Sequence, residues 1–86
     1  MKKSNSKYLK DYEADLITAL YHNYTRLLPT SVLREMERIY EEEKGTTLIT
    51  NYGCSACILK LVKQCARMYF KDDPERIPED LRDRQI

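Results

Sequence analysis

The chain has 86 residues, of which 42% are hydrophobic and 34% charged, and its formal net charge is +1 at pH 7. This composition is typical of one small globular domain rather than of a disordered chain. A net charge near zero gives no general attraction to nucleic acid or membranes, and no run of 18 apolar residues predicts a membrane span. Lys2 and Lys3 are followed by polar residues instead of the apolar run of a secretory signal. We therefore expect a single cytoplasmic domain over residues 1–86, with residues 1–6 and 73–86 flexible.

The first predicted element is a helix over residues 7–28. Its apolar residues are spaced mostly three, four or one apart, which is the period of a helix and not of a strand. They are Tyr8, Leu9, Tyr12, Leu16, Ile17, Leu20, Tyr21, Tyr24, Leu27 and Leu28. Acidic residues near its start and Arg26 near its end suit the helix dipole. Pro29 is expected to end it, because the residue before a proline avoids the helical conformation.

A second helix is predicted over residues 31–44. Thr30 or Ser31 can cap its start by accepting a bond from a free backbone N–H, and Gly45 suits the left-handed conformation that ends many helices. Its apolar stripe consists of Val32, Leu33, Met36, Ile39 and Tyr40.

Residues 46–53 show no helical spacing, and we find no second strand to pair with them. They are therefore predicted to form an extended linker that places Leu48 or Ile49 in the core. A third helix follows over residues 54–71, with the apolar positions Cys54, Cys57, Ile58, Leu61, Val62, Cys65, Met68 and Tyr69. Together these segments predict an all-α three-helix bundle with an irregular C-terminal tail, in which Pro78 can begin a short turn.

The pair Cys54 and Cys57 stands at the start of the third helix, where three interpretations compete. A Cys-x-x-Cys at a helix start is typical of a thiol redox site, but that site belongs to proteins that alternate strands and helices. A structural zinc site needs four ligands, and Cys65 lies about 12 Å along the helix from Cys57, so a zinc ion would have to be shared between two copies. All three cysteines share a face with Ile58, which favours burial as reduced, apolar side chains. A thiol or intermolecular zinc site at the pair is kept as an alternative function.

No combination of residues predicts catalysis. His22 has no serine or aspartate at a recognisable catalytic spacing, and the two glycines, Gly45 and Gly53, do not form a phosphate-binding loop. The acidic run at residues 41–43 lacks the spacing of a calcium loop and is expected to be a solvated face. We therefore expect no enzyme activity, no cofactor and no bound metal.

Four basic residues, Lys60, Lys63, Arg67 and Lys71, follow one face of the third helix, and no acidic residue lies between positions 54 and 71. Such a stripe could follow the phosphates of a nucleic acid. The near-zero net charge argues against this, and the acidic tail could fold back on the stripe. Nucleic-acid binding is therefore an alternative function, and a solvated face is the simpler explanation.

The chain has seven tyrosines and one phenylalanine, an unusual number for its size. A small core cannot bury them all, and tyrosine is enriched in protein interfaces. We expect Tyr12, Tyr24, Tyr40 and Tyr52 to contribute to a surface that binds another protein or a second copy of the chain. The leading hypothesis is a non-enzymatic protein-interaction or assembly module.

Residues 45–70 begin with the run Gly-Thr-Thr-Leu-Ile-Thr-Asn-Tyr-Gly-Cys-Ser-Ala-Cys-Ile-Leu-Lys-Leu-Val-Lys. With the acidic helix that precedes it, this segment resembles small uncharacterised proteins of tailed bacteriophages, in which a short linker joins such a helix to a Cys-x-x-Cys helix. The resemblance implies a phage-encoded structural or host-takeover protein, located in the host cytoplasm or in the virion. It assigns no catalytic residue to this chain.

Overall fold

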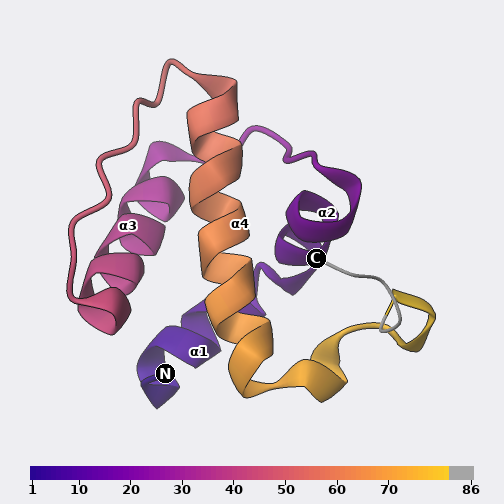
Figure 1. The fold of residues 1–86 in the computed structure, drawn as a ribbon. Coiled ribbons are helices and arrows are strands. Elements are labelled where there is room, and N and C mark those ends of the chain that lie inside the picture. Colours follow the sequence, from indigo (N-terminus) through magenta and orange to yellow (C-terminus); the bar gives the residue numbers. More distant parts are fainter. Residues whose placement is uncertain (82–86) are drawn as a thin grey trace.

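The computed structural model describes residues 1–81, and the regular structure in this range is helical (Figure 1). Its elements are α1 (Lys3–Lys10), α2 (Glu13–His22), α3 (Thr30–Lys44), α4 (Ser55–Asp72) and the short 3-10 turns η1 (Pro74–Arg76) and η2 (Glu79–Leu81). The long α4 is central, with α2 and α3 on either side of it and α1 near its carboxyl-terminal end (Figure 1). The predicted all-α class is confirmed. The prediction of three helices is wrong, because residues 1–81 contain four α-helices.

The predicted first helix is interrupted at Asp11 and Tyr12. Their backbone N–H groups bond to carbonyls three residues earlier, so α1 closes with a tight turn before α2 begins. α2 ends at Asn23, whose φ of 55° is left-handed, a conformation that asparagine adopts more readily than most residues. Residues 24–29 then form a loop instead of the last turns of the predicted helix. Apolar spacing does not reveal these breaks, because it continues across both of them.

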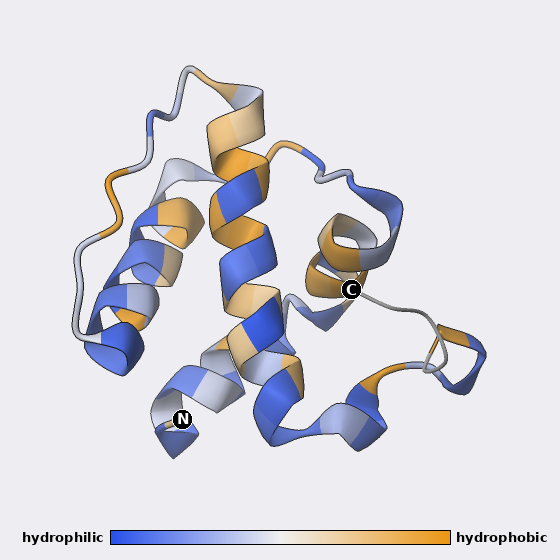
Figure 2. Cartoon of the chain, viewed as in Figure 1, coloured by the Kyte–Doolittle hydropathy of each residue, from blue (hydrophilic) through white to orange (hydrophobic). Residues whose placement is uncertain are grey.

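The core lies between α4 and the helices around it. The buried residues of α4 recur at helical spacing, and they are Ile58, Leu61, Val62, Cys65, Ala66, Met68, Tyr69 and Phe70. They share one buried cluster with Leu9 of α1, Leu16 of α2 and Met36 of α3. Figure 2 shows hydrophilic segments recurring along α4 between the apolar ones, as expected for a helix with one buried face. Burial of these apolar side chains is the main force that holds the short helices together.

α3 matches the predicted helix to within one residue at its start. Gly45 ends it as predicted, with a φ of 69° and an N–H that bonds back to the last helical turn. The predicted caps are wrong, because Thr30 and Ser31 already lie inside the helix and Pro29 precedes it. The carbonyl of Pro29 instead accepts the first backbone N–H bonds of the helix, and proline has no N–H of its own to satisfy.

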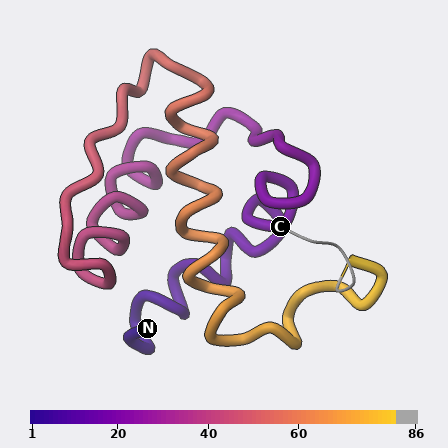
Figure 3. Tube along the Cα trace, viewed as in Figure 1, coloured from indigo at the N-terminus to yellow at the C-terminus, as the bar shows by residue number. Residues whose placement is uncertain are grey.

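Residues 46–53 form the predicted extended linker, which runs back alongside α3 to the start of α4 (Figure 3). Glu37 of α3 anchors it by accepting the backbone N–H of Thr50 at 3.2 Å and the hydroxyl of Tyr52. Leu48 packs against the core, whereas Ile49 is 88% exposed. The linker therefore places one of the two predicted apolar residues against the core.

The segment expected to be flexible at the amino terminus is partly helical. Asn5 lies within α1 and is fully buried, and its amide nitrogen donates to Glu42 at 2.6 Å and to Glu43 at 2.8 Å. These contacts join α1 to the carboxyl-terminal end of α3. They explain why helix begins at Lys3 rather than at residue 7.

The tail has more regular structure than predicted. η1 follows α4 directly, and η2 follows Pro78, where the sequence predicts a short turn. Ile77 packs against the core and Leu81 is buried. The predicted tail also includes residues 82–86, which lie outside the described residues.

Candidate functional site

Polar side chains from distant parts of the chain meet at the carboxyl-terminal end of α4. The hydroxyl of Tyr69 and the Nε of Arg76 both donate to Glu13 Oε2, each at 2.6 Å. Burial and the bond to Glu13 raise the pKa of Tyr69 to about 12. Burial alone would raise the pKa of Glu13, but the hydrogen bonds from Tyr69 and Arg76 outweigh it and lower that pKa.

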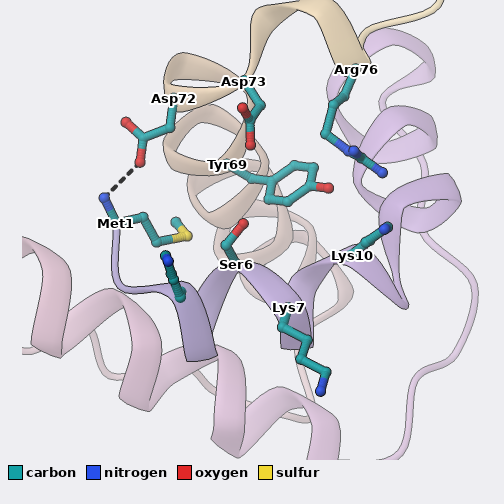
Figure 4. Close-up of a pocket in the computed structure, with 9 residues that line it drawn as sticks. Met1, Ser6, Lys7, Lys10, Tyr69, Asp72, Asp73 and Arg76 are labelled. Atoms are coloured by element: carbon teal, nitrogen blue, oxygen red, sulfur yellow. Dashed lines mark hydrogen bonds and ion pairs between the residues drawn. The ribbon is translucent and has the colours of Figure 1, made fainter.

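A shallow hollow of about 560 Å³ lies beside this cluster (Figure 4). It is lined by Met1, Lys3, Ser6, Lys7, Lys10, Tyr69, Asp72, Asp73 and Arg76. The amino group of Met1 lies 2.7 Å from Asp72, as the dashed line in Figure 4 marks, and Arg76 is bonded to Glu13. Several of the charges around the hollow therefore hold α1, α2, α4 and η1 together. We interpret it as a structural junction.

Apolar side chains are exposed at the opposite, amino-terminal end of α4. Tyr24 is 61% exposed and Leu27 is 91% exposed, and both lie on the loop between α2 and α3. Two shallow hollows of about 240 and 410 Å³ separate this loop from the first turns of α4. Their linings are Thr25, Arg26, Leu27, Leu28, Ser55 and Ile58 for the first, and Asn23, Tyr24, Thr25, Ser55, Ala56 and Leu59 for the second. Exposed apolar groups that flank hollows are typical of surfaces that contact other molecules.

The predicted basic stripe lies on the solvent side of α4. Lys60, Arg67 and Lys71 are exposed, and Lys63 is half-buried with its amino group bonded to the Asn23 side chain. Because Asn23 also lines the larger of the two hollows, the stripe begins beside the apolar loop. At 1.5 Å per residue, the four cations extend over roughly 16 Å of the helix.

The four tyrosines predicted to meet a partner have different surroundings. Tyr24 is exposed, whereas the other three are half-buried and pack against the core. The ring centroids of Tyr12 and Tyr8 are 5.4 Å apart, and the hydroxyl of Tyr52 donates to a glutamate of α3. Tyr40 packs on the core from α3. Tyr24 is therefore the side chain among the four that a partner could cover most fully.

Cys54 and Cys57 are not core residues. Both are half-buried, their Cα atoms are 5.2 Å apart, and their sulfur atoms form a disulfide. The prediction of buried reduced thiols is therefore wrong for this pair, because the first turn of α4 extends past the buried face that begins at Ile58. It is confirmed for Cys65, which is free and fully buried, and burial raises the pKa of its thiol to about 12.

Within residues 1–81, no three His, Cys, Asp or Glu side chains are grouped as ligands for one metal ion. A zinc ion at Cys54 and Cys57 would need the disulfide reduced and further ligands from a second copy, so the intermolecular zinc site stays an untested alternative. His22 is exposed at the end of α2. None of the helices in the described range has both the length and the apolar character needed to cross a membrane.

The sequence did not predict two parts of these surfaces. The apolar spacing places Leu27 in the last turn of the predicted helix over residues 7–28, although Asn23 and Pro29 are residue types that favour a loop. The cluster around Tyr69 joins residues 56 and 63 positions apart, so no local pattern marks it.

Comparisons of the chain with protein-family models, with curated proteins and with solved structures gave no match. The surface at the amino-terminal end of α4 and the basic stripe beside it are therefore the candidate functional site.

Proposed function

We propose that this chain is a non-enzymatic protein-interaction module that binds an acidic, amphipathic segment of a partner protein. The docking surface consists of Tyr24, Leu27, Lys60, Lys63, Arg67 and Lys71. The observation that carries the proposal is the junction of exposed apolar side chains with the basic stripe, made where Lys63 bonds to Asn23. Apolar anchors supply most of the affinity of a protein interface, and charges guide and orient the partner.

The chemistry of the docking surface favours protein over nucleic acid as the partner. Leu27 is aliphatic and 91% exposed, and a phosphate backbone offers such a side chain no apolar surface to bury. A net charge of +1 gives the whole chain little long-range attraction to a polyanion. A helix with acidic residues on one side and leucines on the other would match both halves of the surface.

The proposal includes an assembly or host-takeover role in a tailed bacteriophage, which the resemblance of residues 45–70 suggests. It also allows a second copy of the chain as the partner. Sedimentation of the purified chain over a range of concentrations measures that self-association directly. A monomer at every concentration would restrict the partner to another protein.

The test uses a fluorescent probe peptide of about 20 residues, with glutamate and leucine placed on opposite faces of a helix. Fluorescence anisotropy at low salt should give a dissociation constant of about 100 μM or tighter. The same peptide with serine in place of every leucine should bind at least about tenfold more weakly, because it lacks the apolar anchors. Equal binding of the two peptides would overturn the proposal.

Matched charge variants locate the binding. Lys60→Glu combined with Arg67→Glu reverses two exposed charges of the docking surface, and should weaken peptide binding at least about tenfold. Lys7→Glu combined with Lys44→Glu makes the same change in net charge on α1 and α3, where both lysines are exposed, and should weaken it by no more than about twofold. An equal loss in both variants would show that net charge alone attracts the peptide.

Nucleic-acid binding is the second candidate function, carried by the four cations of the basic stripe. A DNA duplex of about 20 base pairs, measured in the same assay, distinguishes it. If the duplex binds more tightly than the leucine-containing peptide and Leu27→Ser leaves duplex binding unchanged, the partner is nucleic acid. The proposal of a protein partner would then be wrong.

A further inference from the structure

Cys54 and Cys57 form a pair of nucleophilic side chains that the docking surface does not use. Cys54 is the N-cap of α4, and its sulfur accepts the backbone N–H of Cys57 at 3.2 Å. α4 continues for 18 residues, so the partial positive charge of its amino terminus lies beside this sulfur. The Cα separation of 5.2 Å lies in the range in which two cysteines can be joined by a disulfide.

We propose that Cys54 and Cys57 are a redox-active pair that exchanges its disulfide with dithiols of proteins or peptides. Both side chains are half-buried rather than enclosed, so a substrate thiolate can approach from solvent. Ser55 and Ala56, the two residues between the cysteines, are exposed and leave space for the approach. This inference does not rest on the proposed binding of an acidic partner.

The exchange takes place in two steps. A substrate thiolate attacks the sulfur of Cys54, the bond between Cys54 and Cys57 breaks, and Cys57 leaves as a thiolate that takes up a proton. The second substrate thiolate then attacks the substrate sulfur of the mixed disulfide, and Cys54 leaves as a thiolate. The substrate loses two electrons and becomes a disulfide, while the cysteine pair gains two electrons and becomes a dithiol. In the reverse direction the reduced pair reduces a substrate disulfide and itself becomes a disulfide again.

The surroundings assign different roles to the two cysteines. Cys54 is the exchanging residue, because the N–H of Cys57 and the end of the helix both stabilise its thiolate. Cys57 is the resolving residue, one helical turn further on. Cys65 takes no part, because it is fully buried and lies on the opposite side of the helix from solvent.

The first experiment equilibrates the full chain with different ratios of reduced to oxidised glutathione. Excess N-ethylmaleimide then traps the free thiols of the folded protein at the pH of the equilibration, and intact mass spectrometry counts the added labels. Two thiols should appear together as the buffer becomes more reducing, and the third, at Cys65, should stay unmodified while the protein is folded. A Cys65→Ser variant should change from disulfide to dithiol at the same ratio of reduced to oxidised glutathione. A pair that stays oxidised, or stays reduced, at every ratio would overturn the proposal.

The second experiment separates the roles of the two cysteines. In a Cys65→Ser background, Cys57→Ser leaves Cys54 as the one thiol, and Cys54→Ser leaves Cys57. The reaction with an aromatic disulfide reagent is followed from acidic to alkaline pH. At acidic pH Cys54 should react at least about tenfold faster than Cys57, with an apparent pKa below the value of about 8.5 for a free cysteine. Equal rates would overturn the assignment, and circular dichroism confirms that each variant is folded.

Discussion

The two ends of α4 are surrounded in opposite ways. At the carboxyl-terminal end Tyr69 is buried, and its hydroxyl and Arg76 share the carboxylate of Glu13. At the amino-terminal end Leu27 is 91% exposed, and Cys54, the N-cap of the helix, is half-buried. Buried polar groups that bond within the chain contribute to its stability, whereas exposed apolar groups gain most from covering by a partner. The stabilising cluster and the proposed docking surface thus lie at opposite ends of one helix, and substitutions at the two ends should affect different measurements.

The largest expected effect is that of Tyr69→Ala at the carboxyl-terminal end. The ring is 2% exposed and packs edge-on against Phe70, with 5.0 Å between ring centroids. Its removal should lower the free energy of unfolding by about 3–5 kcal/mol, as for other buried aromatic side chains. Urea unfolding followed by circular dichroism measures the loss. Tyr69→Phe keeps the ring and should cost only about 1 kcal/mol, so equal losses would show that the hydroxyl matters more than the packing.

Glu13→Ala is expected to have the next largest effect. It leaves the hydroxyl of Tyr69 and the guanidinium of Arg76 without the carboxylate that both now use. The free energy of unfolding should fall by about 1–3 kcal/mol in the same urea experiment. Glu41→Ala is the matched control, because Glu41 is an exposed glutamate of α3, and its change should stay within about 0.5 kcal/mol. If Glu41→Ala lowers the free energy of unfolding as much as Glu13→Ala does, the cluster around Tyr69 has no special role in stability.

Local patterns predicted α3 and α4 well, and predicted the first part of the chain poorly. α3 lies between Pro29 and Gly45, and the apolar spacing of α4 matches its buried face. The break between α1 and α2 instead depends on the rest of the fold. It accompanies the packing of Leu9 and Leu16 into one core and the burial of Asn5 against the end of α3.

The same distinction explains which parts of the candidate surfaces could be predicted. The basic stripe was predicted because exposure along a helix follows its period, and Lys60, Arg67 and Lys71 are exposed. The exposure of Leu27 could not be predicted, because it depends on where α2 ends. The position of Cys54 at the edge of the core depends on how far α4 extends beyond its neighbours, which no spacing along the chain records.

Acid should weaken the carboxyl-terminal end of α4 through Glu13. The pKa of Glu13 is lowered in the folded chain from an ordinary value of 4.5, as are those of Glu42 and Glu43, which accept hydrogen bonds from α1 and its start. A carboxylate with a lowered folded pKa contributes stability that is present above its unfolded pKa and is lost as pH falls through the folded pKa. The melting temperature should therefore decrease below about pH 4.5. The Glu13→Gln variant should have a lower melting temperature at pH 7, and that temperature should decrease less on acidification. If the pH dependence of the melting temperature is unchanged in this variant, Glu13 does not contribute to it.

The smallest expected change in stability is that of Leu27→Ser at the amino-terminal end. Since Leu27 has almost no buried surface to lose, the free energy of unfolding should change by no more than about 0.5 kcal/mol. Binding of the leucine-containing acidic peptide should nevertheless weaken at least about tenfold. The substitution should therefore reduce binding without reducing stability, the opposite of the substitutions at Tyr69 and Glu13. Ile49→Ser is the matched control, because Ile49 is 88% exposed on the linker and lies outside the docking surface. If Ile49→Ser weakens binding as much as Leu27→Ser, the peptide adheres to any exposed apolar side chain, and the amino-terminal end of α4 has no special role in binding.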